Sequence, residues 1–202
     1  MTYVAPVTPK RHFFQAYCSQ LSKLLETFDW SPVECLAAEL LDCWKTHRQV
    51  FIAGNGGSAA NAVHLANDFL YGISKTHGSG LRVHSLPANQ AVMTCLANDE
   101  GYDKIFSSQL VILAQPGDVL IVLSGSGNSP NIVGALDEAR RLKMKSYAIL
   151  GYSGGNAKAL ADTAVHFEID DMQLAEDAQL IVGHMIMQWL YSQRNHVHPI
   201  RP

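Results

Sequence analysis

The sequence has few features that would tie the chain to a membrane, to nucleic acid or to a secretory route. Its apolar runs, such as residues 110–114, are far too short to cross a bilayer. The formal net charge of -3 argues against nucleic acid or an anionic membrane surface as the main partner. The N-terminus lacks the charged and then apolar segment of a signal peptide, so we expect a cytoplasmic protein.

The sequence also has few cysteines and no segment of biased composition. The four cysteines show no C-x-x-C spacing and fall in segments expected to be helical, which indicates reduced, buried thiols: they are Cys18, Cys35, Cys43 and Cys95. No low-complexity tract, long linker or internal repeat divides the 202 residues, and 48% of them are apolar. We therefore expect one well-filled core and a single domain over residues 1–202.

Beyond residue 48, short apolar segments alternate with helical ones. Strands are predicted over 48–53, 81–86, 119–123, 145–150 and 164–168. Helices are predicted over 12–28, 32–47, 59–71, 89–97, 102–113, 130–141 and 174–194, with a short one after 151–155. Strands separated by helices imply parallel pairing with right-handed crossovers, and so a three-layer αβα sandwich around a central five-stranded parallel sheet. The expected parts are an N-terminal helix pair (1–48), the αβα core (49–194) and a tail (195–202).

The most informative segment is the loop after the strand at 119–123. It reads Ser-Gly-Ser-Gly-Asn-Ser over residues 124–129 and leads into a helix. Its glycines let the backbone fold tightly, and the free N–H groups at the helix N-terminus favour an anion. The hydroxyl donors are Ser124, Ser126 and Ser129. Because lysine is absent, the loop is no P-loop, and it suits the single phosphate monoester of a small sugar phosphate.

A second glycine-rich loop, Gly-Asn-Gly-Gly-Ser-Ala over residues 54–59, satisfies the pattern G-x-G-x-x-A. Taken alone, this pattern indicates a dinucleotide site, but a nicotinamide site needs an acidic residue at the end of the next strand. The strand at 81–86 carries no carboxylate, so we expect no nucleotide cofactor. Because ligands bind at the carboxyl ends of parallel strands, both glycine-rich loops are expected to face one pocket.

Two helices carry side chains suited to proton transfer or metal binding. His64 and Asp68 are four residues apart on one helix and share a face. Glu176 and His184 are eight residues apart on the last helix, or roughly 12 Å along its axis. Two histidines and two carboxylates brought together across an interface could bind one divalent ion such as zinc, or act as a metal-free acid and base.

Six segments, in order along the chain, resemble the sugar isomerase (SIS) domain and, within it, the phosphoheptose isomerases. They are residues 53–60, 64–68, 97–102, 116–119, 124–129 and 176–184. The resemblance implies a flavodoxin-like SIS fold and a homotetramer with active sites between subunits, in whose assembly the N-terminal helix pair takes part. It also implies an aldose–ketose isomerase that interconverts sedoheptulose 7-phosphate and D-glycero-D-manno-heptose 7-phosphate through an enediol.

The same resemblance assigns roles to single residues. The phosphate is expected on Ser124, Gly125, Ser126 and Ser129. The sugar is expected on Asn55, Gly56, Ser58, Asp99 and Glu176. From the residue types on the two helices, Asp68 is the expected base and His184 the expected acid, with His64 and Glu176 assisting or binding metal. The expected ligands of a zinc ion are His64, Asp68, Glu176 and His184.

Three positions depart from the usual family pattern. Gly125 stands where the family has threonine, which removes one hydroxyl. Asp68 stands where the family has glutamate, so the base retreats by about 1–1.5 Å, and a misplacement of that size can cost about a hundredfold in rate. Glu176 stands where the family has glutamine, and its charge could bind metal, supply a second base or repel a substrate anion.

Two other functions fit the sequence. One is a non-catalytic phosphosugar-binding or adaptor protein, since members of this group also serve as regulators that bind a partner, including one associated with the bacterial replication initiator. The other is an isomerase of a different ketose phosphate, with five or six carbons. Retention of His64 and His184 favours an enzyme, while Asp68 and Glu176 leave the question open.

Overall fold

A single parallel sheet forms the centre of the molecule. The computed structural model describes residues 11–75 and 79–197. The strands are β1 (Gln49–Gly54), β2 (Arg82–Ser85), β3 (Val119–Ser124), β4 (Lys145–Leu150) and β5 (Thr163–His166). They lie in the order β2-β1-β3-β4-β5, and every neighbouring pair is parallel. The predicted five-stranded parallel sheet of an αβα sandwich is confirmed.

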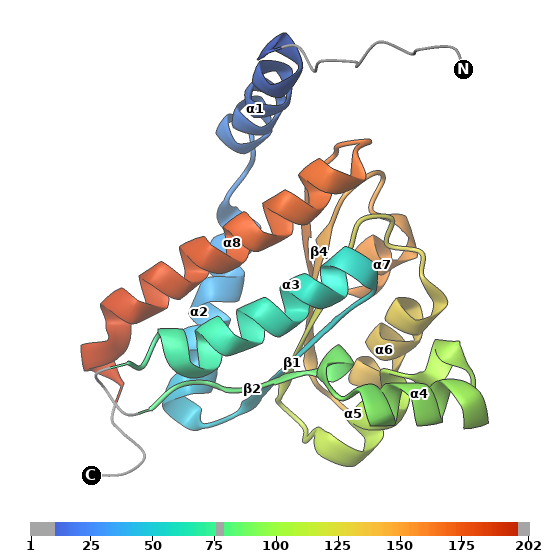
Figure 1. Cartoon of the computed structure of the whole chain (residues 1–202). Helices are drawn as coiled ribbons and strands as arrows, with labels where there is room; N and C mark the ends of the chain where they lie inside the picture. Colours follow the sequence, from blue (N-terminus) through green and yellow to red (C-terminus); the bar gives the residue numbers. More distant parts are fainter. Residues whose placement is uncertain (1–10, 76–78, 198–202) are drawn as a thin grey trace, which may run out of the picture.

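Helices cover both faces of this sheet (Figure 1). One face packs against α2 (Ser31–Thr46), α3 (Gly56–Asn67) and α8 (Met172–Gln193). The other packs against α4 (Gln90–Asp99), α5 (Ser107–Leu113), α6 (Pro130–Arg141) and α7 (Gly155–Leu160). Along β1, Val50 and Ile52 join the first core and Phe51 and Ala53 the second. This strand reads as a continuous apolar run because both of its faces are buried.

The sheet order reverses between β1 and β3, which are direct neighbours. The connections that leave these two strands run to helices on opposite faces, so a crevice opens between them at the carboxyl edge. The two glycine-rich loops of the sequence are these connections. Topology therefore gathers them at one place.

Helix α1 (Arg11–Glu26) extends away from the sandwich, and none of its residues is buried (Figure 1). Phe13 and Phe14 are 68% and 55% exposed on it. Its Tyr17 hydroxyl donates a hydrogen bond to Asp177 of α8, at 2.5 Å. Among the described residues, α1 thus has no apolar surface that buries the side chains of Phe13 and Phe14.

The expectation that all four cysteines are buried is wrong. Cys43, on the core side of α2, is buried, and burial raises the pKa of its thiol to about 12. The other three thiols are exposed: Cys18, Cys35 and Cys95. They lie in helices as predicted, but helix membership alone does not decide which face of the helix a residue occupies.

The helix predicted over 59–71 differs in its course from the expectation. It begins at Gly56 and changes at Asp68 into a π-helical turn, Asp68–Gly72. The returning chain passes so close to this turn that a Cβ on Gly80 would lie 1.7 Å from the Leu70 carbonyl oxygen. Three 3-10 turns complete the described elements, Leu86–Ala88, Tyr102–Lys104 and Arg194–His196.

Along the described residues, no helix combines the length and the apolar character that a membrane span requires.

Candidate active site

Both glycine-rich loops line one pocket at the carboxyl edge of the sheet, as the sequence predicted. The pocket has a volume of about 270 Å³, and we call it the serine pocket. Its walls are the β1–α3 loop, the β3–α6 loop and the first turns of α8. The lining residues are Asn55, Gly56, Gly57, Ser58, Leu123, Ser124, Gly125, Ser126, Ser129, Met172 and Glu176.

Hydrogen bonds within the β3–α6 loop fix its hydroxyl groups. The Ser124 hydroxyl accepts from the Gly127 N–H at 3.0 Å, and the Ser126 hydroxyl accepts from the Asn128 N–H at 3.3 Å. Each hydroxyl keeps its own proton to donate. Ser129 is the N-cap residue of α6, with no side-chain cap hydrogen bond. The loop therefore presents hydroxyl donors beside the positive end of a helix dipole, which suits a phosphate.

The loop over residues 151–155 and the start of α7 pack against the β3–α6 loop, which we call the serine loop. The Gly151 N–H donates to the Gly125 carbonyl at 3.0 Å, and the Ala157 N–H donates to the Gly127 carbonyl at 2.9 Å. Gly127 has a φ of 68°, and a Cβ on it would lie 2.0 Å from the Gly154 carbonyl oxygen. Only glycine fits this close approach of two backbones.

Gly125, the position where the family pattern has threonine, faces Met172 at the start of α8. A Cβ on Gly125 would lie 2.5 Å from the Met172 sulfur and 3.0 Å from its methyl carbon. A threonine there would need Met172 to move away. In this chain the methionine therefore fills the space that a side chain on the loop would take, and it lines the serine pocket itself.

A network of amides that the sequence did not reveal orients Asn55. Asn55 and Asn131 exchange hydrogen bonds through their amide groups, at 2.8 and 2.9 Å. The Tyr102 hydroxyl donates to the Asn55 oxygen at 3.1 Å. Asn131 is almost fully buried, two residues after Ser129. One feature of the sequence could have pointed to Asn131: it is a polar residue in the first turn of the helix that follows the serine- and glycine-rich loop.

Glu176 extends from α8 to the first turn of α3. A Cβ on Gly57 would lie 2.3 and 2.4 Å from its two carboxylate oxygens, so the carboxylate occupies the place of a side chain at position 57. The Asn61 amide fixes the backbone nearby, since it donates to the Glu176 carbonyl at 3.0 Å and to the Gln179 side chain at 3.2 Å. Asn61 is a further residue that sequence reasoning missed.

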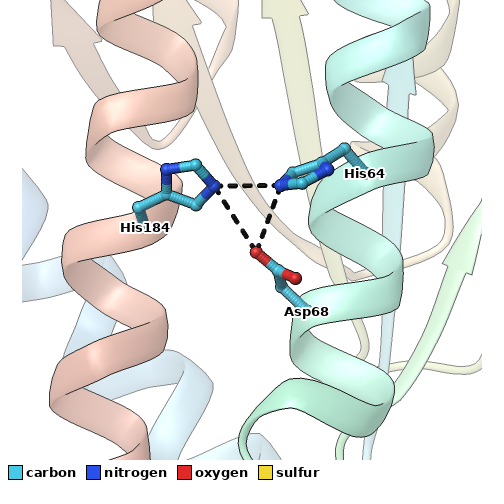
Figure 2. Close-up of side chains that lie close together, drawn as sticks. All are labelled: His64, Asp68 and His184. Carbon is cyan, nitrogen blue, oxygen red and sulfur yellow. Dashed lines mark hydrogen bonds and ion pairs between the residues drawn. The ribbon is translucent and has the colours of Figure 1, made fainter.

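Three polar side chains from α3, its π turn and α8 converge further along the helices (Figure 2). The His64 Nε2 and His184 Nε2 atoms are 2.9 Å apart. The Asp68 Oδ2 atom lies 3.3 Å from the first and 3.6 Å from the second. We call this group the imidazole cluster. One atom of each residue lies within 4.8 Å of the others, and two imidazoles with a carboxylate form a ligand set that zinc accepts.

Close packing of two helices brings the imidazoles together. Gly183 directly precedes His184 in the sequence, and Leu65 directly follows His64. A Cβ on Gly183 would lie 2.1 Å from the Leu65 Cδ2 atom. Helices α3 and α8 approach each other this closely because position 183 has no side chain. The histidine rings are 48% and 40% exposed for His64 and His184, so solvent or a ligand reaches them.

Of the four residues predicted as metal ligands, the structure brings three together, and Glu176 is separate from them. Glu176 lies two helical turns before His184 on α8, roughly 12 Å along the axis. Gly57 precedes His64 by seven residues on α3, roughly 10 Å. The serine pocket and the imidazole cluster therefore lie at two levels of the same pair of helices.

Asp99, predicted to contact the sugar, is outside the lining of the serine pocket. It is the last residue of α4 and is exposed. Its carboxylate accepts a hydrogen bond from the Asn98 amide, which lowers the pKa of the carboxyl group, with a smaller effect from the Cys95 thiol. Gly56 and Ser58, in contrast, line the pocket as expected.

The fold and the site together define a class of protein: parallel αβα sandwiches with a serine- and glycine-rich loop at the switch point of the sheet. The family model of the SIS domain matches residues 12–151. The chain belongs to the SIS domain family.

Several similar proteins are phosphoheptose isomerases. The phosphoheptose isomerase of Aliarcobacter butzleri is 33% identical over 183 residues, which cover 91% of this chain and 96% of that protein. The one of Trichlorobacter lovleyi is 35% identical over 156 residues, 77% of this chain and 79% of that protein. The solved structure of GmhA, the phosphoheptose isomerase from Neisseria gonorrhoeae, superposes with a TM-score of 0.83 at 26% identity, and covers 90% of this chain and 98% of that one.

Proposed function

We propose that the chain is an aldose–ketose isomerase of phosphoheptose type, which interconverts sedoheptulose 7-phosphate and D-glycero-D-manno-heptose 7-phosphate. The observation that carries this proposal is the imidazole cluster, two helical turns from a pocket suited to one phosphate. The relatives at 33% and 35% identity that are named for this activity support it.

The spacing of the two parts of the site fits a long sugar chain. With the phosphate on the serine loop, the reacting carbons must reach the histidines roughly 10 Å away, by the rise of the helices. An extended seven-carbon chain with a terminal phosphate spans roughly 10 Å, given carbon single bonds of about 1.5 Å. A pentulose phosphate is two carbons shorter and would fall short of the imidazole cluster.

The proposed proton transfers use Asp68 and His184. Asp68 removes the proton from C1 of the ketose, while His184 gives a proton to the carbonyl oxygen on C2, and an enediol results. Return of a proton to C2 and loss of the O1 proton then give the aldose. The side chains of both residues lie beside His64, which holds them in one group through contacts of 3.3 and 2.9 Å. Such positioned acids and bases contribute about 10²–10⁴ to a rate.

The imidazole cluster also fits a divalent metal ion. Its two imidazole nitrogens and one carboxylate oxygen leave a coordination position open, as catalytic zinc sites do. When bound, zinc would polarise the oxygens on the reacting carbons. We propose zinc as the ion, held by His64, Asp68 and His184, with Glu176 facing the serine pocket. Zinc binding is the alternative to the metal-free acid and base roles of Asp68 and His184, because the same side-chain atoms serve both.

We also propose that the chain assembles into a homotetramer through α1. A groove of about 430 Å³ between α2 and α8 is lined by apolar side chains that include Trp30, Met185 and Trp189. Two of these are well exposed, Met185 at 45% and Trp189 at 39%. The aromatic face of α1 from a second copy would cover this groove. Replacing Phe13 and Phe14 by glutamate should lower the molar mass seen by light scattering, and an unchanged mass would contradict this arrangement.

The function is tested by incubating purified protein with ketose phosphates of five, six and seven carbons in deuterium oxide. We expect deuterium to enter next to the carbonyl carbon of sedoheptulose 7-phosphate, with little entering the shorter sugars. Zinc-loaded and chelator-treated samples, run side by side, determine whether the ion is needed. If none of the sugars exchanges in either sample, the chain is a binding or adaptor protein rather than an isomerase.

A further inference from the structure

Tyr152 has a strained backbone at a place where no helix ends. Its φ is 44°, in the left-handed region that is sterically unfavourable for a residue with a Cβ. The other described non-glycine residues with positive φ are His47 and Lys143, and they lie where α2 and α6 end, a common place for this conformation. Tyr152 instead follows β4, in the loop over residues 151–155. Contacts from the surrounding structure must therefore hold it.

Two hydrogen bonds hold the backbone of Tyr152. Its N–H donates to the Ile169 carbonyl at 3.0 Å. Its carbonyl oxygen lies 2.9 Å from the Nε2 atom of His166, and because a carbonyl only accepts, this nitrogen carries the proton and donates. His166 is half-buried and is the last residue of β5, in register with Leu150 of β4. Because this second contact comes from a side chain, a single substitution can remove it.

The residues on either side of Tyr152 contact the serine loop. Before it, the Gly151 N–H donates to the Gly125 carbonyl at 3.0 Å. After it, the Gly154 backbone lies so close to Gly127 that a Cβ on Gly127 would be 2.0 Å from the Gly154 oxygen. The Tyr152 ring lies beside the same loop, since a Cβ on Gly125 would be 3.6 Å from its Cε2 atom. A change in the conformation of Tyr152 would therefore shift the serine loop.

We propose that His166 is a positioning residue for the phosphate site: it holds Tyr152 in the left-handed conformation and thereby keeps the serine loop in place. His166 is outside the lining of the serine pocket, so it acts through the loop over residues 151–155 and not by touching the ligand. The inference rests on the proposed function, because it takes the serine loop to hold the phosphate of the sugar. It adds a residue of β5 that controls the affinity for the substrate and not the proton transfers.

The first test removes the donor and keeps a ring. His166→Phe should raise the KM for sedoheptulose 7-phosphate about fivefold to tenfold, as the loss of one partly buried hydrogen bond predicts, while kcat changes by less than about twofold. The Kd for heptitol 7-phosphate, which has no carbonyl group and cannot be turned over, should rise equally in calorimetric titration. His166→Gln places an amide N–H near the position of Nε2 and should bind within about twofold of the wild type.

His84→Phe is the matched control, because it makes the same change on β2. The His84 ring contacts the Gln49 side chain and is outside the lining of the serine pocket, so this variant should keep the wild-type affinity.

A double-mutant cycle tests whether the strain at Tyr152 is the link. Tyr152→Gly allows the left-handed conformation without a steric cost. His166→Phe should therefore raise the Kd by less than about threefold when Tyr152→Gly is also present. An equal rise with and without Tyr152→Gly would overturn the inference.

Hydrogen exchange in the ligand-free proteins separates this inference from the proposed function. The amides of Gly151 and Ala157, which donate to the serine loop, should exchange faster in His166→Phe than in the wild type, and at the wild-type rate in His166→Gln. Unchanged affinity or unchanged exchange in His166→Phe would overturn the inference, as would weak binding by His166→Gln. If the wild type fails to bind heptitol 7-phosphate, the proposed function is contradicted, and the exchange rates alone decide whether His166 positions the loop.

Discussion

The serine pocket and the imidazole cluster are held by different kinds of contact. The pocket loops are fixed by backbone hydrogen bonds, such as those that join Gly151 to Gly125 and Ala157 to Gly127. The cluster joins side chains 120 positions apart in the sequence, and its geometry depends on how closely α3 and α8 pack. Small changes between the two helices should therefore disturb the chemistry more than the binding of phosphate.

The largest effect is expected from His184→Ala. Loss of a positioned acid should lower kcat by about 10²–10⁴ while the affinity for a sugar monophosphate stays close to that of the wild type. Steady-state kinetics and calorimetric binding together measure this separation. His196→Ala, at an exposed position beyond α8, is the control and should behave as the wild type. Turnover retained in His184→Ala would remove this histidine from the mechanism.

A smaller loss is expected from Gly183→Ala, which tests whether helix packing sets the cluster. The added methyl group meets Leu65, so α3 and α8 must separate or Leu65 must shift. Overpacking of this kind costs about 1–3 kcal/mol of stability, measured by denaturant unfolding. Displaced histidines should lower kcat by about tenfold to a hundredfold, with binding of phosphate little changed. Equal losses of kcat and of phosphate affinity would show that the two regions are not independent.

Gly125→Thr tests the pocket alone. The new side chain must displace Met172, so the KM for the sugar phosphate should rise about tenfold through misplacement of the loop, with a smaller change in kcat. The double variant Gly125→Thr, Met172→Ala makes room for the threonine and should recover most of that loss. If the double variant is worse than the sum of the two single changes, Met172 does not oppose a side chain at this position.

The smallest effect is expected from Asn131→Ala, which removes one of the two partners that orient Asn55. Tyr102 still donates to the Asn55 oxygen, so the amide remains partly held. Loss of the buried hydrogen bonds should cost about 1–3 kcal/mol of stability, and KM should rise by about threefold to fivefold. Asn131→Asp keeps an acceptor for the Asn55 amide but loses the donor to the Asn55 oxygen, so its comparison with Asn131→Ala separates the two hydrogen bonds. A kcat effect as large as that of His184→Ala would place Asn131 in the chemistry itself.

Much of the fold and of the serine pocket could be predicted from the sequence because their signals are local. Apolar runs between helical segments gave five parallel strands, and the glycine and serine spacing placed both loops at one edge of the sheet. The π turn at Asp68 escaped prediction, since no residue pattern in 59–71 separates it from an ordinary helix. Asn61 and Asn131 were missed because a single amide in a helix has no periodicity to reveal its partner across the molecule.

Glu176 shows where reasoning from the sequence reached its limit. The residue was grouped with the two histidines and Asp68 as a metal ligand, although its spacing from His184 already made a common ion demanding. The structure places its carboxylate against Gly57, in the serine pocket. The side chain follows the first turn of α8, and two turns of helix separate that level from the imidazoles. Spacing along one helix is fixed by its rise, so only extended side chains could bring Glu176 and His184 to a common ion, and in this structure the Glu176 side chain turns to Gly57 instead.

The sequence by itself determined the order of strands and helices, the glycine-serine loops and the chemical types available for a site, because these follow from local propensity and patterning. Tertiary structure alone decided that His64 and His184 meet, that Met172 fills the space beside Gly125 and that Glu176 lies against Gly57 in the serine pocket. Each of these depends on the distance between two helices or loops far apart in the chain. That distance is set by how the side chains of both segments pack together, and neither segment's sequence determines this packing by itself.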